Sequence, residues 1–200
     1  MKKITLIGDS VFDNVVYVSE GHSVSDYLNS LVNDGDEIIL SAVDGSIIED
    51  VYEQDISAKS DFVFLSVSGN DGISDLQSKY LTSELENKLN SDELENYLSE
   101  LASNLKEKYE KLVQHILSIN KSLILCTIYS VIFDDPIIKQ VVDKGLFLLN
   151  QNILDIGSKY NLKVLRFDEL INKKEDFTQT IEPSEKGGKI IAQEIFNNID

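Results

Sequence analysis

The sequence predicts an α/β fold, a three-layer α/β/α sandwich built around a five-stranded parallel sheet. Five short runs of apolar, often β-branched residues are continuous rather than alternating, which is typical of strands buried on both faces. Between these runs lie longer stretches whose apolar residues recur every three or four positions, the spacing of one helix face. Because strands and helices alternate along the chain, we expect right-handed crossover connections and one parallel sheet.

The expected elements follow one another in a regular order. Apolar runs predict strands over residues 4–7, 37–42, 62–66, 122–128 and 163–167. Apolar periodicity predicts helices over 24–31, 94–116, 137–160 and 184–196, two of them close to the prolines Pro136 and Pro183. Residues 70–90 form the least regular stretch, and we expect a lid or an insertion there.

Length and composition limit the classes of function. The 200 residues, 42% of them apolar, suit one globular domain spanning 1–200. A formal net charge of -17 repels phosphate backbones and anionic lipid surfaces, so we expect neither nucleic acid nor membrane as a partner. The first apolar stretch is too short for a signal peptide and no run reaches membrane-spanning length, which favours a cytoplasmic protein. The single cysteine, Cys126, lies in an apolar run and is expected to be inert core.

Three loops that follow strands carry residues suited to acyl transfer. In an open parallel sheet the loops after successive strands meet at one edge, and here they contain Ser10, Gly45 and Asn70. A serine hydroxyl attacks a carbonyl carbon, a glycine lets its backbone N–H approach the developing oxyanion, and an asparagine amide supplies a further neutral donor. The sequence therefore predicts a nucleophile beside an oxyanion hole.

Four blocks in order along the chain resemble the SGNH (GDSL) hydrolase family, specifically a small single-domain bacterial branch of it. They are Gly8-Asp9-Ser10 with the following Val11 to Asn14, then Gly45, then Gly69-Asn70-Asp71, and finally Pro183 to Gly187. The resemblance implies a flavodoxin-like sheet and hydrolysis of a small oxygen ester carrying an acyl or acetyl group. It also implies that Ser10 is the nucleophile, and that the Ser10 amide, Gly45 and Asn70 form the oxyanion hole.

The last block departs from the family pattern. Where the family has Asp-x-x-His-Pro, this sequence reads Gln179-Thr180-Ile181-Glu182-Pro183, so both partners of the serine are replaced. One interpretation makes Glu182 an unusual general base, oriented by the Gln179 amide. The alternative is a catalytically impaired family member that binds a small acyl or acetylated-sugar ligand. Neither histidine offers an obvious substitute: His115 is expected to be structural or on the surface, and His22 to lie on the surface.

Further polar residues border the same edge. Asp9, Asp13, Asn14 and Asp71 are candidates for binding the substrate. A structural interpretation is that Asp9 and Asp71 hold their loops by accepting backbone N–H bonds. A third interpretation is that several of these carboxylates, together with those of Asp44 and Glu182, bind Mg²⁺ or Ca²⁺. We expect no cofactor and a small-molecule ester or acylated ligand as partner, while the oligomeric state stays open.

Overall fold

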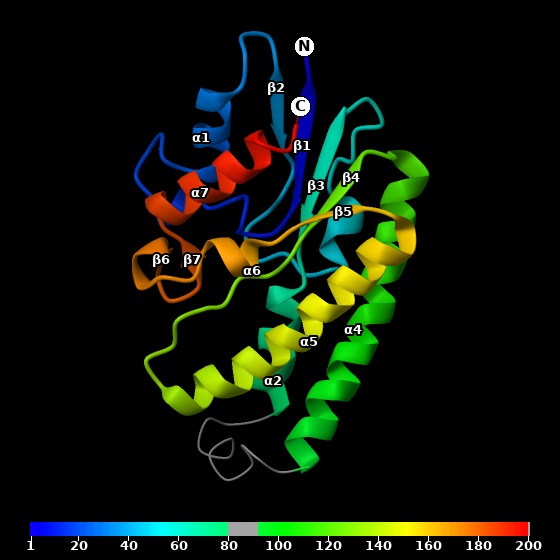
Figure 1. The fold of residues 1–200 in the computed structure, drawn as a ribbon, viewed down its shortest axis with the longest axis vertical. Helices are drawn as coiled ribbons and strands as arrows, with labels where there is room; N and C mark the ends of the chain where they lie inside the picture. Colours follow the sequence, from blue (N-terminus) through cyan, green and yellow to red (C-terminus); the bar gives the residue numbers. More distant parts are fainter. Residues whose placement is uncertain (80–91, 200) are drawn as a thin grey trace.

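The computed structural model describes residues 1–79 and 92–199 (Figure 1). Five strands form the central sheet, and all four pairings are parallel. The strands are β1 (Lys3–Gly8), β2 (Glu37–Leu40), β3 (Phe62–Ser66), β4 (Leu123–Cys126) and β5 (Lys163–Leu165). Their order is β2-β1-β3-β4-β5, the flavodoxin-like order, which reverses direction between β1 and β3. The reversal leaves a crevice beyond the ends of β1 and β3, where Ser10 and Asn70 follow their strands.

Helices cover both faces of the sheet, which gives the three layers (Figure 1). On one face α1 (Val24–Leu31) packs against α7 (Glu185–Phe196), and their apolar residues meet Ile4, Leu6 and Phe64. On the other face α4 (Asp92–Ile119) and α5 (Pro136–Tyr160) pack on Val63 and Leu65. Neighbouring residues of each strand therefore enter opposite cores, which explains why the strands read as continuous apolar runs.

Short elements connect these layers. They are η1 (Val15–Tyr17), η2 (Asp50–Glu53), α2 (Gly69–Lys79), α6 (Phe167–Leu170), η3 (Lys174–Asp176), β6 (Phe177–Thr178) and β7 (Glu182–Pro183). The last two strands pair antiparallel as a small hairpin directly before α7. Two residues per strand are too few to leave an alternating pattern, so the sequence did not predict this hairpin.

The five predicted strands and four predicted helices are confirmed, with small differences at their ends. The expectation of an irregular segment over 70–90 is wrong for its first part, because Gly69–Lys79 is helical; the remainder falls outside the described residues. The α2 pattern escaped detection because polar residues interrupt its apolar face. Cys126 is fully buried, as expected, and burial raises the pKa of its thiol.

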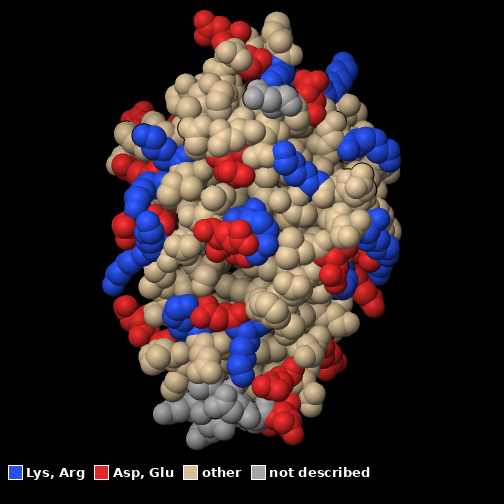
Figure 2. Space-filling view, in the orientation of Figure 1, with Lys and Arg blue, Asp and Glu red and all other residues tan. Residues whose placement is uncertain are grey.

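Basic and acidic side chains are interspersed on the face shown in Figure 2. Within the part of the chain that the structure describes, no helix is long and apolar enough to cross a membrane. The absence of a nucleic-acid partner stays a prediction from net charge.

Candidate active site

The first site loop begins where β1 passes very close to β3. Gly8 has a φ of +129°, and a Cβ atom there would lie 1.8 Å from the Ser66 carbonyl oxygen. The Gln54 side chain satisfies the Gly8 backbone, accepting from its N–H at 2.8 Å and donating to its carbonyl at 2.7 Å. Asp9 N–H then donates to the Ser66 carbonyl at 3.1 Å. This close approach turns the chain and leaves Ser10, 7% exposed, at the carboxyl edge of the sheet.

Neutral hydrogen-bond donors surround this serine loop. The Asn70 Nδ2 atom donates to the Ser46 carbonyl at 3.0 Å, which fixes the amide and leaves its second N–H available. Gly45 has a φ of +78° and open space where a Cβ would be. Among the described residues, no hydrogen bond engages the backbone N–H of Ser10 or of Gly45. Such free donors suit an oxyanion that forms only in the transition state.

Acidic side chains of the first loop hold the second loop in place. Asp13 accepts from the Asp44 backbone N–H at 3.0 Å, and Tyr17 donates from its hydroxyl to the Asp44 carboxylate at 2.8 Å. The Val43 N–H donates to the Gly8 carbonyl at 3.1 Å. Gly45 is thus fixed between the Ser10 loop and Asn70.

The hairpin before α7 brings Glu182 to the serine. Asn14 is fully buried; its Nδ2 donates to the Pro183 carbonyl at 3.2 Å, and its Oδ1 accepts from the Val24 N–H at 2.9 Å. Tyr129, in the loop that follows β4, donates from its hydroxyl to the Ile181 carbonyl at 2.9 Å. Two buried side chains therefore hold the backbone on both sides of Glu182, which is itself only 6% exposed.

Burial dominates the electrostatics of Glu182. It raises the pKa of this carboxyl above its ordinary value, and the negative charge of Asp44 raises it further. The nearby Ser10 hydroxyl acts in the opposite direction and lowers the pKa. The Glu182 Oε2 atom is buried without a hydrogen-bond partner. The serine hydroxyl is therefore next to a carboxylate that is more basic than one in water.

Two more carboxyl groups nearby are also hard to ionise. Burial raises the pKa of Asp9 to about 7, with added repulsion from Glu182 and Asp71. Burial raises the pKa of Asp71 to about 6, although the Ile48 N–H donates to it at 3.1 Å and opposes that shift. Near neutral pH a substantial fraction of Asp9 is protonated, which reduces the negative charge facing an oxyanion.

A cavity of about 50 Å³ lies beside Ser10, Asn70 and Glu182. Its remaining wall is mostly apolar, formed by Val11, Ile73, Ile128, Val131, Val142 and Leu146. One water needs roughly 10–15 Å³ on this measure, so the cavity holds a group larger than water. Its size and lining suit a short acyl group attached to the serine.

The other expected site residues take different positions. Gly45 does not line this cavity; together with Asp44 and Ser46 it lines a separate hollow. Asp13, Asn14 and Asp71 do not line the cavity either, because each bonds backbone groups that join two loops. Asp9 lines the cavity and accepts from the Val11 N–H at 3.1 Å. These contacts match the loop-holding interpretation, and the substrate-binding role stays a prediction. In the described ranges, 1–79 and 92–199, no group of three or more His, Cys, Asp or Glu residues is arranged to hold a metal ion.

The expectation that Gln179 orients Glu182 is wrong. Gln179 is exposed in the hairpin turn with a φ of +44°, and its carbonyl accepts from the Ile181 N–H. The histidines are also elsewhere: His22 is exposed and bonds the Glu20 carbonyl at 3.0 Å, and His115 stacks on Tyr52 with ring centroids 5.0 Å apart. Neither ring lines the Ser10 cavity.

Solved structures show where this architecture recurs. A phospholipase A1 from Streptomyces albidoflavus NA297 superposes with a TM-score of 0.75 at 11% identity, covering 98% of both chains. A lipolytic protein of the G-D-S-L family from Veillonella parvula DSM 2008 gives 0.69 at 15% identity, covering 98% of this chain and 97% of the other. The chain has the fold of the SGNH/GDSL hydrolases.

An acetylxylan esterase from Geobacillus stearothermophilus shares the SGNH/GDSL architecture, with a TM-score of 0.67, 16% identity and coverage of 99% and 94%. No protein-family model and no curated protein sequence matches the chain. At these identities the likeness concerns the fold alone.

Sequence reasoning missed two residues that shape this SGNH/GDSL-type site. Gln54 completes the hydrogen bonds of Gly8 and also donates to the Ser46 hydroxyl at 3.3 Å. Tyr129 lines the cavity and holds the Glu182 hairpin. The position of Tyr129 just after a predicted strand was a usable signal, whereas nothing in the local sequence singles out Gln54.

Asp9→Asn is expected to stabilise the protein increasingly as pH rises. With a folded pKa of about 7 against an ordinary 3.8, Asp9 keeps its proton in the folded state after the unfolded chain has lost it. Folding stability therefore falls between about pH 4 and about pH 7, and asparagine removes that fall. Relative to wild type, the variant should gain on the order of 3 kcal/mol between about pH 4 and about pH 8, measured by urea unfolding. A stability difference independent of pH would contradict the raised pKa.

Proposed function

We propose that this protein is a serine ester hydrolase acting on a small oxygen ester, with Ser10 as nucleophile and Glu182 as general base. The observation that carries the proposal is the placement of Ser10, Asn70 and the buried Glu182 carboxylate around one cavity, where burial raises the pKa of Glu182. Structural neighbours that are lipases, esterases and acetylxylan esterases make ester hydrolysis the natural reaction class.

The proposed reaction has two halves. The Ser10 Oγ attacks the ester carbonyl while Glu182 accepts its proton, and the oxyanion accepts hydrogen bonds from the N–H groups of Ser10 and Gly45 and from the Asn70 amide. Glu182 then gives the proton to the departing alkoxide, leaving an acyl-serine. Water attacks this acyl group with Glu182 again as base, which releases the acid and regenerates Ser10.

Glu182 is a workable base because of its surroundings. An ordinary glutamate, with a pKa of ~4.3, is about two units less basic than histidine at ~6.5. Burial raises the pKa of Glu182 and recovers part of this difference. A carboxylate base leaves the site more negative than an imidazole would, and the protonated fraction of Asp9 offsets that excess.

The test is turnover of short-chain aryl esters together with labelling by an aryl phosphonate, which reacts with activated serines. Wild type should release the phenol and carry one phosphonyl group on Ser10, located by peptide mass spectrometry, and Ser10→Ala should do neither. Equal ester hydrolysis by wild type and Ser10→Ala would overturn the proposal. A rise in melting temperature with ester ligands, but no product, would instead support the ligand-binding alternative.

A further inference from the structure

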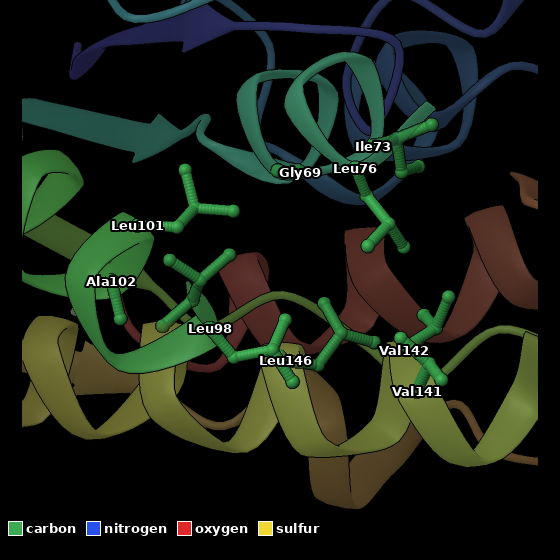
Figure 3. Close-up of a pocket in the computed structure, with 12 residues that line it drawn as sticks. Gly69, Ile73, Leu76, Leu98, Leu101, Ala102, Val141, Val142 and Leu146 are labelled. Carbon is green, nitrogen blue, oxygen red and sulfur yellow. The ribbon is translucent and has the colours of Figure 1, made fainter. Parts of the chain in front are cut away.

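A second apolar cavity lies directly behind the Ser10 cavity. It has a volume of about 40 Å³ and is enclosed by α2, α4 and α5. In Figure 3 side chains from the three helices converge on it, with Ile73 and Leu76 from α2, Leu98 and Leu101 from α4, and Val141 and Leu146 from α5. All of its lining residues are apolar, so it contains no side chain that would recognise a sugar or a charged group. We call this space the helix chamber.

The helix chamber and the Ser10 cavity share a wall. Four residues line both of them: Gly69, Ile73, Val142 and Leu146. The side chains of Ile73, Val142 and Leu146 are all partly exposed. The side chains that separate the two cavities are therefore Ile73, Val142 and Leu146, and a linear group that starts at Ser10 would reach the helix chamber past them.

Small residues create the space in the helix chamber. Gly72, Ala102 and Gly145 lie on three different helices and all line it. A Cβ on Gly145 would lie 3.8 Å from the Leu98 Cδ2 atom, an ordinary contact, and one on Gly72 would lie 3.2 Å from the Leu149 Cδ1 atom. Glycine inside a helix costs roughly 0.5–1 kcal/mol relative to alanine. Gly145 thus keeps empty volume at the expense of stability, whereas Gly72 allows Leu149 to pack closely against α2.

We propose that the helix chamber receives the end of a linear acyl chain whose ester carbonyl is held at Ser10. The substrate class is then an ester of a straight-chain fatty acid longer than acetate, and Gly145 sets the longest chain accepted. This inference rests on the proposed ester hydrolase function. Each methylene buried in such a site contributes about fourfold in affinity until the chamber is full.

The first experiment measures kcat/KM for para-nitrophenyl acetate, butyrate, hexanoate, octanoate and decanoate. In wild type the values should rise from acetate to the longer chains and then fall. Gly145→Leu, which fills the helix chamber, should lower the octanoate-to-acetate ratio by at least about tenfold, the effect of two lost methylenes. Phe147→Leu is the matched control, because Phe147 is on the outer side of α5 and is 64% exposed; its ratio should equal that of wild type.

The second experiment measures binding without turnover. Sodium octanoate should raise the melting temperature of wild type and of Ser10→Ala, and acetate should not. Gly145→Ala is the variant that we expect to fold in any case, because its added methyl group lies at ordinary contact distance and alanine favours the helix. It should shift the preferred ester to a shorter acyl chain.

The outcomes separate the two proposals. A wild type that prefers acetate and gains no stability from octanoate would overturn the acyl-chain proposal and leave ester hydrolysis standing. Octanoate stabilisation that Gly145→Leu abolishes, without hydrolysis of any ester, would support the helix chamber and overturn the hydrolase function. An unchanged chain-length profile in Gly145→Ala and Gly145→Leu would also overturn the acyl-chain proposal.

Discussion

Glu182→Gln is expected to lower kcat for aryl ester hydrolysis by about 10²–10⁴-fold, the usual contribution of a positioned general base. Glutamine is close in size to glutamate but cannot accept the Ser10 proton. The protein should stay folded, because the substitution removes a buried charge whose Oε2 atom has no hydrogen-bond partner. Steady-state kinetics together with thermal unfolding would separate a lost base from a lost fold.

The pH profile gives this prediction a second readout. Only the ionised carboxylate accepts a proton, so the wild-type rate should rise with pH through the pKa of Glu182, above the ordinary range of a glutamate. The residual rate of Glu182→Gln should lack this rise. Glu185→Gln is the matched control: Glu185 is three residues further along, does not line the Ser10 cavity, and accepts from the Ser19 N–H at 3.3 Å. Equal rates and equal pH profiles in wild type, Glu182→Gln and Glu185→Gln would exclude Glu182 as the base.

Gly8→Ala is expected to be the most destabilising single methyl addition in the site. The new Cβ would lie 1.8 Å from the Ser66 carbonyl oxygen, in a backbone conformation with a φ of +129°. The three nearest atoms all belong to the Ser66 backbone, so no side-chain rotation relieves the clash and β1 and β3 have to separate. A loss of more than about 4 kcal/mol in the free energy of unfolding follows, the range of severe core disruptions.

A second glycine separates the clash of the added Cβ atom from the cost of a side chain at positive φ. Gly21 has a φ of +80°, but nothing lies within 4 Å of where its Cβ would be. Gly21→Ala should therefore cost only about 1–2 kcal/mol, the penalty of the left-handed conformation. Urea unfolding of both variants measures the difference. Equal losses would mean that the close approach of β1 and β3 does not control stability.

The fold was predictable because its signals are local. Continuous apolar runs mark strands buried on both faces, and the three-and-four spacing marks helix faces, so both can be read from short windows of sequence. Two elements gave no periodic signal and were missed. The strands of the β6–β7 hairpin are too short, and the helix α2 is too polar.

The candidate site was predictable in its residue types and less so in its contacts. Ser10, Gly45, Asn70 and Glu182 were expected together; Ser10, Asn70 and Glu182 line one cavity, whereas Gly45 lines another. Gln179 was expected to orient Glu182, yet the positive φ of the hairpin turn places it in an exposed position. The residues that hold Glu182 in place are Asn14 and Tyr129, and they come from loops far away in the chain.

The α/β/α architecture and the loops beside Ser10 could be predicted from sequence, because the periodicity of apolar residues selects the elements and parallel strands align their carboxyl ends. The properties of Glu182 and the depth of the apolar space beside Ser10 depend on the tertiary packing. The basicity of a carboxylate depends on how much water packing removes and which hydroxyl it meets, and a cavity depends on which side chains face each other across three helices. Both are set by contacts between distant segments.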